Sequence, residues 1–101
     1  MALKPLEESI KEELKIRKRI YEKEGKVVVT IEKIIVERYP DNKIIFEYKI
    51  GDETHTDCIE GKEKSEVYKY IKRIAEELKK NKEINNYTED VKKDTITFFY
   101  E

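Results

Sequence analysis

The spacing of apolar residues along the chain predicts two helices and four strands. The first helix is expected from Pro5, which suits a first helical position, to the residue before Gly25, which suits the position just past a helix end. Glu7 and Glu8 fall in its first turn, where the helix dipole favours acidic groups. One side of this helix carries an apolar stripe formed by Leu6, Ile10, Leu14, Ile20 and Tyr21.

Arg17 is unusual because its position falls near the centre of that apolar stripe. In one interpretation the aliphatic stem lies on the core and the guanidinium reaches water. In the other, the charge is reserved for a partner or for a buried carboxylate. The first interpretation is favoured, although Glu13 also stands four residues earlier, at the spacing of a favourable helical ion pair.

After residue 25 the pattern becomes that of β-strands. Residues 27–31 and 34–36 are mostly β-branched and apolar on both alternating faces, which is typical of a central strand covered on both sides. Turn-forming residues at 39–42 precede a second strand at 44–50. A third strand at 54–60 is polar on both faces, which indicates a sheet edge.

A second helix is predicted over residues 65–80, with a buried stripe formed by Val67, Ile71, Ile74 and Leu78. Asn81, Asn85 and Asn86 mark the loop that follows, and the chain closes with a short aromatic strand at 95–100. The expected fold is therefore a single α+β domain spanning residues 1–101. Its order is α-β-β-β-α-β, with a mostly antiparallel four-stranded sheet and two helices packed on it.

The last strand places large apolar groups on both of its faces. Leaving Phe98, Phe99 and Tyr100 in water would forfeit roughly 1.5–3 kcal/mol for each large side chain. The strand is expected beside the first strand, parallel to the strand from which the helix crosses over. The alternative is that it pairs with a second copy of the chain. These three residues and Arg17 are the candidates for self-association.

Composition supports a folded chain. Of 101 residues, 22 are Lys or Arg and 23 are Asp or Glu, so the charges nearly cancel, whereas disordered chains combine high net charge with few aromatic residues. Abundant Lys and Glu with scarce Met and Cys is the pattern of proteins from hot-growing organisms. In compositional style, the chain resembles small orphan proteins of hyperthermophilic archaea and their viruses.

Location and covalent chemistry follow from what the sequence lacks. No apolar run approaches the ~20 residues of a membrane span, and the first residues do not form a signal peptide. A cytoplasmic, intracellular protein without a membrane partner is therefore expected. Cys58 is the single cysteine, so no internal disulfide can form, and the glycosylation sequon at residues 86–88 is attributed to chance.

Candidate catalytic groups are few. His55 and Cys58 are three residues apart in one strand, so their side chains should point to opposite faces and cannot form a nucleophile–base pair. His55 is expected to be an exposed edge residue and Cys58 a small buried hydrophobe. A zinc site using His55, Asp57 and another carboxylate is conceivable, but a solvated strand face is favoured. We expect no enzyme activity, metal, cofactor or small-molecule substrate.

Nucleic-acid binding has one supporting feature. Residues 62–82 hold eight Lys or Arg against four Glu, and Lys69, Lys72, Arg73 and Lys80 cluster opposite the buried stripe of their helix. Such a cluster can contact phosphates. An ordinary solvated helix face is the favoured alternative, because the pI of about 6.0 is far below the ~9 typical of dedicated binders.

One family resemblance concerns element order. Residues 5–80 follow an α-β-β-β-α order, and Gly61-Lys62-Glu63-Lys64 precede the second helix. In this order the chain resembles double-stranded-RNA-binding domains, which place a lysine-rich segment there. The family's Gly-Pro-x-His loop is replaced by Tyr39-Pro40-Asp41-Asn42, and its Lys-Lys-x-Ala-Lys signature is absent. The resemblance therefore implies architecture and not RNA contacts.

The leading functional hypothesis is a non-enzymatic binding or assembly protein that forms a homodimer, the commonest soluble assembly. The alternative is a nucleic-acid-binding module that uses the second helix. An inhibitor that binds a host protein by shape and surface charge is also compatible with this sequence, as is an enzyme of unrecognised type.

Overall fold

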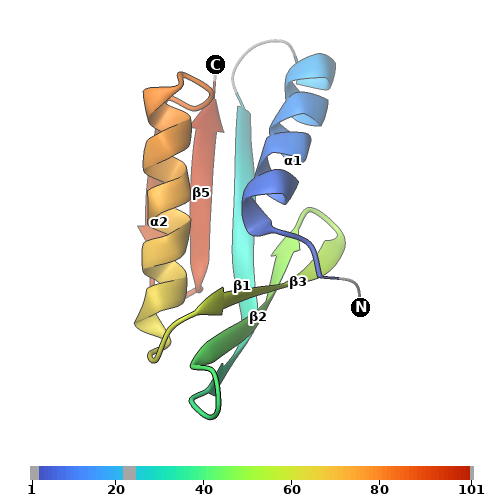
Figure 1. The fold of residues 1–101 in the computed structure, drawn as a ribbon. Coiled ribbons are helices and arrows are strands. Elements are labelled where there is room, and N and C mark those ends of the chain that lie inside the picture. The colour runs from blue at the N-terminus through green and yellow to red at the C-terminus, as the bar shows by residue number, and fades with distance from the viewer. Residues whose placement is uncertain (1–2, 22–24, 101) are drawn as a thin grey trace.

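A computed structural model describes residues 3–21 and 25–100. Seven elements follow one another along the chain (Figure 1). They are α1 (Leu6–Tyr21), β1 (Gly25–Glu37), β2 (Lys43–Ile50), β3 (Glu53–Glu60), α2 (Ser65–Lys80), β4 (Asn86–Asp90) and β5 (Thr95–Tyr100). The predicted α+β class is confirmed, and within the described residues neither helix is long and apolar enough to cross a membrane.

The strands form one antiparallel sheet in the order β3-β2-β1-β5-β4. The predicted edge position of β3 is confirmed. The predicted count of four strands is wrong, because residues 86–90 form β4 at the opposite edge. This strand is short and polar, and its backbone pairing with β5 makes it a strand despite its weak sequence pattern.

The strand at 95–100 lies beside β1 as predicted. It pairs antiparallel with β1, and it therefore also runs antiparallel to β3, whereas a direction parallel to β3 was predicted. The crossover expectation applies to the strand that the helix reaches first, which is β4. The antiparallel pairings make β4 run in the same direction as β3, the strand before the crossover. The tight turn at residues 91–94 then reverses the chain into β5.

The long strand β1 holds the sheet together. Its first half pairs with β5, from Gly25 opposite Tyr100 to Thr30 opposite Thr95. Its second half pairs with β2, from Val29 opposite Ile50 to Glu37 opposite Lys43, with a register shift between Ile31 and Lys33. The predicted central position of this strand is confirmed.

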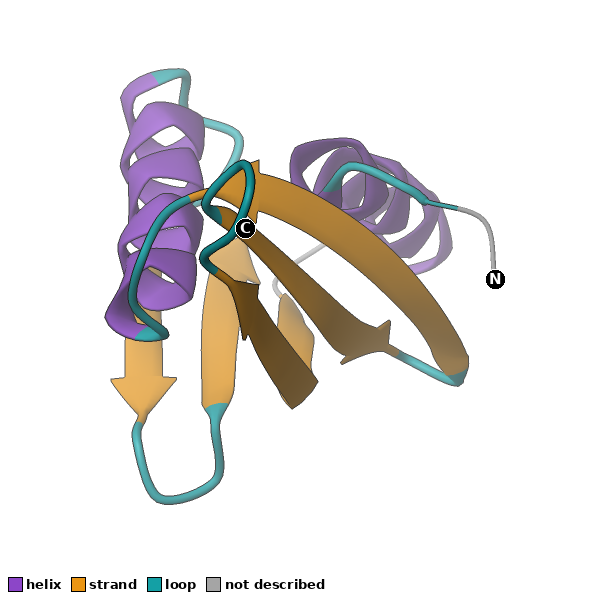
Figure 2. Ribbon diagram, turned by 60° about the horizontal axis from the view of Figure 1, so that its bottom comes forward, coloured by secondary structure: helices purple, strands orange, loops and turns teal. Residues whose placement is uncertain are grey.

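Both helices lie on the same side of the sheet (Figures 1 and 2). Helix α1 packs on β1 and β2, and α2 packs near β4. The core lies between helices and sheet, and it includes Val27, Val29, Phe46, Tyr48, Ile71 and Phe98. The expectation that β1 is covered on both sides is wrong, because its other face has no layer above it among the described residues.

The start of α2 is closed by its own first turn. The Glu66 carboxylate accepts hydrogen bonds from the backbone N–H groups of Glu63 and Lys62. These two bonds favour the charged form and hold the pKa of Glu66 below its ordinary value. The carboxylate of the first helical turn therefore ties the loop at residues 62–63 to the start of α2.

Candidate interaction surfaces

The structure separates the two residues that could have formed a nucleophile pair. His55 is paired with Tyr48 on the helix side of the sheet, and Cys58 is paired with Ile45 on the other side. The predicted opposite orientations are thus confirmed. His55 is less exposed than expected, with 18% of its side chain accessible, because its ring lies 5.5 Å from the Tyr48 ring and its Nε2 lies 3.1 Å from Glu53.

Asp57 is a buried carboxylate, and its contacts explain its place in the core. Its Oδ2 accepts the backbone N–H of Leu6 at 2.9 Å and the Tyr70 hydroxyl at 3.3 Å. Its Oδ1 accepts the N–H of Cys58 at 2.7 Å. Leu6 is the first residue of α1, whose N–H has no partner inside the helix. Asp57 therefore caps α1 from β3, which is a structural task.

A second buried polar group lies next to this cap. The Tyr48 hydroxyl donates to the carbonyl of Lys4 at 2.8 Å and shares a 2.7 Å hydrogen bond with Ser9. Burial raises the pKa of Tyr48 and of Tyr70 to about 12. Both phenols therefore keep their protons near neutral pH and serve as hydrogen-bond donors rather than as bases.

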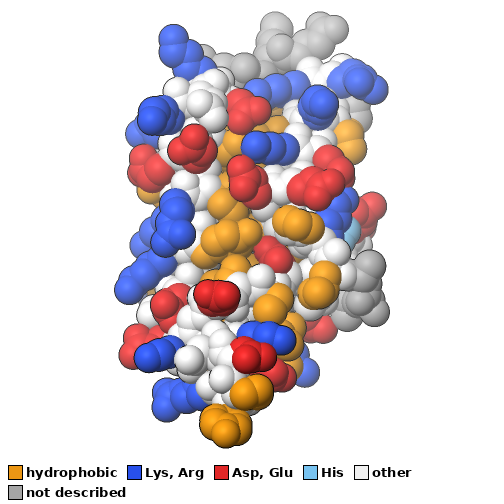
Figure 3. All heavy atoms as spheres, in the orientation of Figure 1, with side chains coloured by type: hydrophobic (Ala, Val, Ile, Leu, Met, Phe, Trp, Pro, Cys, Tyr) orange, Lys and Arg blue, Asp and Glu red, His pale blue; other side chains and the backbone are white. Residues whose placement is uncertain are grey.

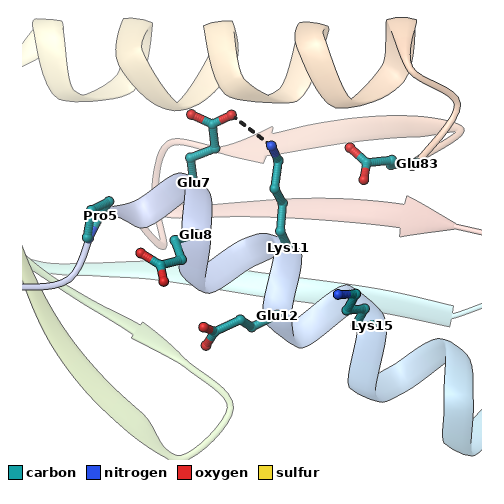
Figure 4. Close-up of a pocket in the computed structure, with 7 residues that line it drawn as sticks. All are labelled: Pro5, Glu7, Glu8, Lys11, Glu12, Lys15 and Glu83. Atoms are coloured by element: carbon teal, nitrogen blue, oxygen red, sulfur yellow. Dashed lines mark ion pairs between the residues drawn. The ribbon is translucent and has the colours of Figure 1, made fainter.

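The geometry gives little support to a metal site or to catalysis in a cleft. Across residues 3–21 and 25–100, no three His, Cys, Asp or Glu side chains gather around a common point. A hollow of about 530 Å³ lies along α1, lined by Pro5, Glu7, Glu8, Lys11, Glu12, Lys15 and Glu83 (Figure 4). Glu7 points toward Lys11, at 3.2 Å, while Glu8 and Glu12 point to another side of the helix. These carboxylates diverge, as they do on a solvated helix face.

The predicted basic cluster lies on the outer surface of α2, where all four of its residues are exposed. Figure 3 shows Lys and Arg side chains along α2 with acidic groups among them. Lys72 forms an ion pair with Glu89 of β4 at 3.2 Å. Within the described residues, Lys69, Arg73 and Lys80 have no ion-pair partner.

The structure divides the predicted self-association residues. Phe98 and Tyr100 lie in the core at 0% and 2% exposure, so their own chain covers them. Phe99 points to the other side of the sheet and is 37% exposed. Arg17 forms the predicted ion pair with Glu13, at 2.9 Å, with both side chains about one-quarter to one-third exposed. The side chains of Ile20 and Tyr21, which the predicted stripe includes, lie outside the described positions.

The sheet surface opposite the helices, here called the uncovered face, is the feature that sequence reasoning missed. Strand alternation and register place all six threonines of the chain on it: Thr30, Thr54, Thr56, Thr88, Thr95 and Thr97. It also carries Phe99 and Ile35, which are 37% and 42% exposed. Ile35, Ile45 and Cys58 form one apolar row across three strands.

A signal for this face was present in the sequence. Threonine is β-branched and polar, so it suits a strand position that faces water. In β5, threonines alternate with core residues at positions 95–98, which indicates one covered and one uncovered side. The signal was hidden in β1, where Val28 and Ile35 give the uncovered face an apolar pattern.

Comparison with known proteins adds no assignment. No protein-family model, no curated protein and no solved structure matches this chain.

Proposed function

We propose that the protein is a non-enzymatic binding and assembly protein that works as a homodimer. The binding role is carried by the one-sided construction of the sheet, and the homodimer by the open edge at β4. Both helices cover one side, and the other side presents apolar groups with no layer above them in the described chain. Exposed apolar surface of this kind is typical of sites that contact another protein.

Two further observations support the proposal. The polar atoms of Asp57, Tyr48 and Tyr70 are engaged in capping and core hydrogen bonds, so none of these three groups is free to act in catalysis. The sheet also ends at β4, an edge strand that no other described segment pairs with. Open edges readily pair with a further strand, and two-fold pairing is the commonest solution for soluble proteins.

Sedimentation velocity and light scattering of the full chain test the proposal. We expect the mass of a dimer at concentrations of tens of micromolar, with dissociation on dilution. A monomer over the whole concentration range would refute the homodimer. The binding constant for the pair, measured by a dilution series, then provides the reference for the variants described below.

A second candidate function, binding of nucleic acid through α2, is supported by the exposed charges of Lys69, Arg73 and Lys80. Phosphate contacts of this kind release counterions, so affinity for duplex DNA or RNA should fall steeply between low and moderate salt. Reversing these three charges to Glu should abolish binding. Reversing Lys15, Lys26 and Lys33 makes the same change in net charge elsewhere and is the control. No binding of either duplex at low salt would exclude this function.

A further inference from the structure

We infer that the second copy docks on the outer edge of β4, with the two β4 strands antiparallel about a two-fold axis at Thr88. This inference rests on the proposed homodimer and names the surface that it uses. This pairing of the β4 strands joins the two five-stranded sheets into one continuous sheet and leaves the uncovered face of each copy accessible.

The two edges of the sheet differ. On the β3 edge, Leu3 forms a parallel bridge with Thr56, and the Lys4 N–H donates to the Thr56 carbonyl at 2.8 Å. The N-terminal segment therefore occupies that edge. The β4 edge has no such cover among the described residues, and β4 contains neither proline nor a bulge, two devices that commonly block edge pairing.

The direction of the β4 backbone groups follows from the bonds of its neighbour β5. The Ile31 N–H donates to the Asp94 carbonyl at 2.9 Å, so Asp94 and every second residue after it in β5 face β1. The residues between them, Thr95, Thr97 and Phe99, therefore face β4 and bond to their partners Asp90, Thr88 and Asn86. This arrangement turns the backbone groups of Tyr87 and Glu89 outward, away from β5.

Thr88 is the middle residue of β4. Two copies centred on it form a non-hydrogen-bonded pair at Thr88, flanked on each side by hydrogen bonds between Tyr87 and Glu89 of the partner subunit.

This register avoids opposing like charges. Asn86 meets Asp90 of the partner subunit, and Tyr87 meets the partner's Glu89. A register centred on Glu89 instead would place two glutamates directly opposite each other, which is destabilising. Side chains on β4 therefore favour the Thr88-centred arrangement.

Helix α2 contributes complementary charges to the same seam. Lys72 lies over Glu89 at 3.2 Å, and Glu76 accepts the Tyr87 hydroxyl at 2.6 Å, so these two helix positions straddle Thr88. The two-fold axis that passes through Thr88 consequently brings Lys72 opposite Glu76 of the partner subunit. Because of the symmetry, the interface contains two such pairs. Each Lys72 then lies between its own Glu89 and the partner's Glu76, an arrangement that an unrelated partner would not supply.

The uncovered face is a poorer surface for the second copy. Its two apolar spots, at Phe99 and at Ile35, lie at opposite ends of β1, since Phe99 pairs with Lys26 and Ile35 lies near the other end. Between them are Thr30, Lys33 and the β2 residues Glu47 and Lys49. A dry interface over this face would have to desolvate those charges.

Two substitutions test the inference by dimer dissociation in dilution series. Glu89→Pro removes an outward N–H and leaves the bonds to β5 intact, because proline is tolerated at a sheet edge when its missing N–H faces solvent. Glu76→Lys places two lysines opposite each other. We expect each to raise the dimer dissociation constant at least about tenfold, a loss of 1.4 kcal/mol or more.

Matched controls introduce the same residues elsewhere. Thr54→Pro places proline at an exposed position of the other edge strand, and Glu77→Lys makes the same charge change beside Glu76 on α2. Both should leave the dissociation constant within about threefold of the original value. Circular dichroism verifies that each variant is folded, and Glu76→Lys, an exposed helical substitution, carries the test if the proline variant fails to fold.

The outcomes separate this inference from the proposed function. A wild-type monomer refutes both. A wild-type dimer that Glu89→Pro and Glu76→Lys leave intact overturns the β4 interface and keeps the homodimer. Dissociation by Phe99→Lys with both β4-side variants still dimeric would assign the interface to the uncovered face instead.

Discussion

At the scale of single residues, hydrogen bonds to the start of helix α1 explain why the polar groups Asp57 and Tyr48 lie inside the core. The first N–H groups of α1 cannot bond within the helix, and the carboxylate of Asp57 on β3 accepts one of them. The helix dipole adds a favourable interaction with that negative charge. A charged residue in a β-strand that faces the core is thus explained by the unpaired N–H group of the helix packed above it.

Replacing Asp57 by Asn should lower the free energy of unfolding by about 1–3 kcal/mol, because an amide cannot accept hydrogen bonds at both former oxygen positions. Urea unfolding followed by circular dichroism measures the change. Asp52→Asn, at an exposed turn position, is the matched control and should alter stability by less than about 0.5 kcal/mol. Equal stability of the two variants would contradict the capping role of Asp57.

The C-terminal aromatic residues show how far sequence reasoning reaches at this scale. That Phe98, Phe99 and Tyr100 need cover follows from their size alone. Which of them is covered depends on which side of the sheet the helices occupy, and that is decided by packing among distant elements. The structure buries Phe98 and Tyr100 and leaves Phe99 partly exposed, so the need for a partner rests on fewer residues than the sequence indicates.

At the scale of elements, the β2–β3 hairpin depends on a left-handed turn residue. Gly51 has φ +61°, a conformation that residues with a Cβ adopt at a cost. Gly51→Ala should therefore lower the free energy of unfolding by about 1 kcal/mol. Asp52→Ala in the same turn, where φ is not positive, is the control. Urea unfolding of both variants gives the comparison, and an unchanged stability of Gly51→Ala would show that the turn relaxes without strain.

Strand β4 marks the limit of prediction for elements. The two helices and the strands β1, β2 and β5 have strong apolar periodicity, and sequence reasoning finds them together with β3, whose pattern is weaker and polar. Residues 86–90 contain one aromatic residue among polar ones, and the asparagines before them favour a loop. They form a strand because β5 offers an unpaired edge after docking on β1. That cause lies in tertiary pairing, which a local pattern does not record.

At the scale of the whole molecule, the fold has one layer of helices and one layer of strands. This construction explains both the well-filled core and the candidate surfaces, because within residues 3–21 and 25–100 the open sheet has helices on one side only and ends at β4. The basic residues of α2 were found from sequence because helix periodicity exposes them. The uncovered face and the β4 edge were not, because each depends on how all seven elements are arranged.

The tyrosines that tie these two layers together predict how the stability of the molecule depends on pH. Tyr48, Tyr68 and Tyr70 have pKa values raised to about 12, chiefly by burial, above the ordinary value of about 10. The folded chain thus keeps these protons to a higher pH than the unfolded chain does. Their stabilising contribution is complete below pH 10 and is lost as pH rises from about 10 to 12.

Urea unfolding at pH 8, 10 and 11 should therefore show a falling free energy of unfolding above pH 10, when lysines also begin to lose charge. Phenolate absorbance near 295 nm isolates the tyrosine contribution, because lysine does not absorb there. In the folded protein, part of the absorbance of the seven tyrosines should develop only above about pH 11. Tyr70→Phe should remove one share of that late absorbance. If all the tyrosines titrate together near pH 10 while the chain stays folded, the phenols between helices and sheet are open to water, and the packing of the two layers described above is wrong.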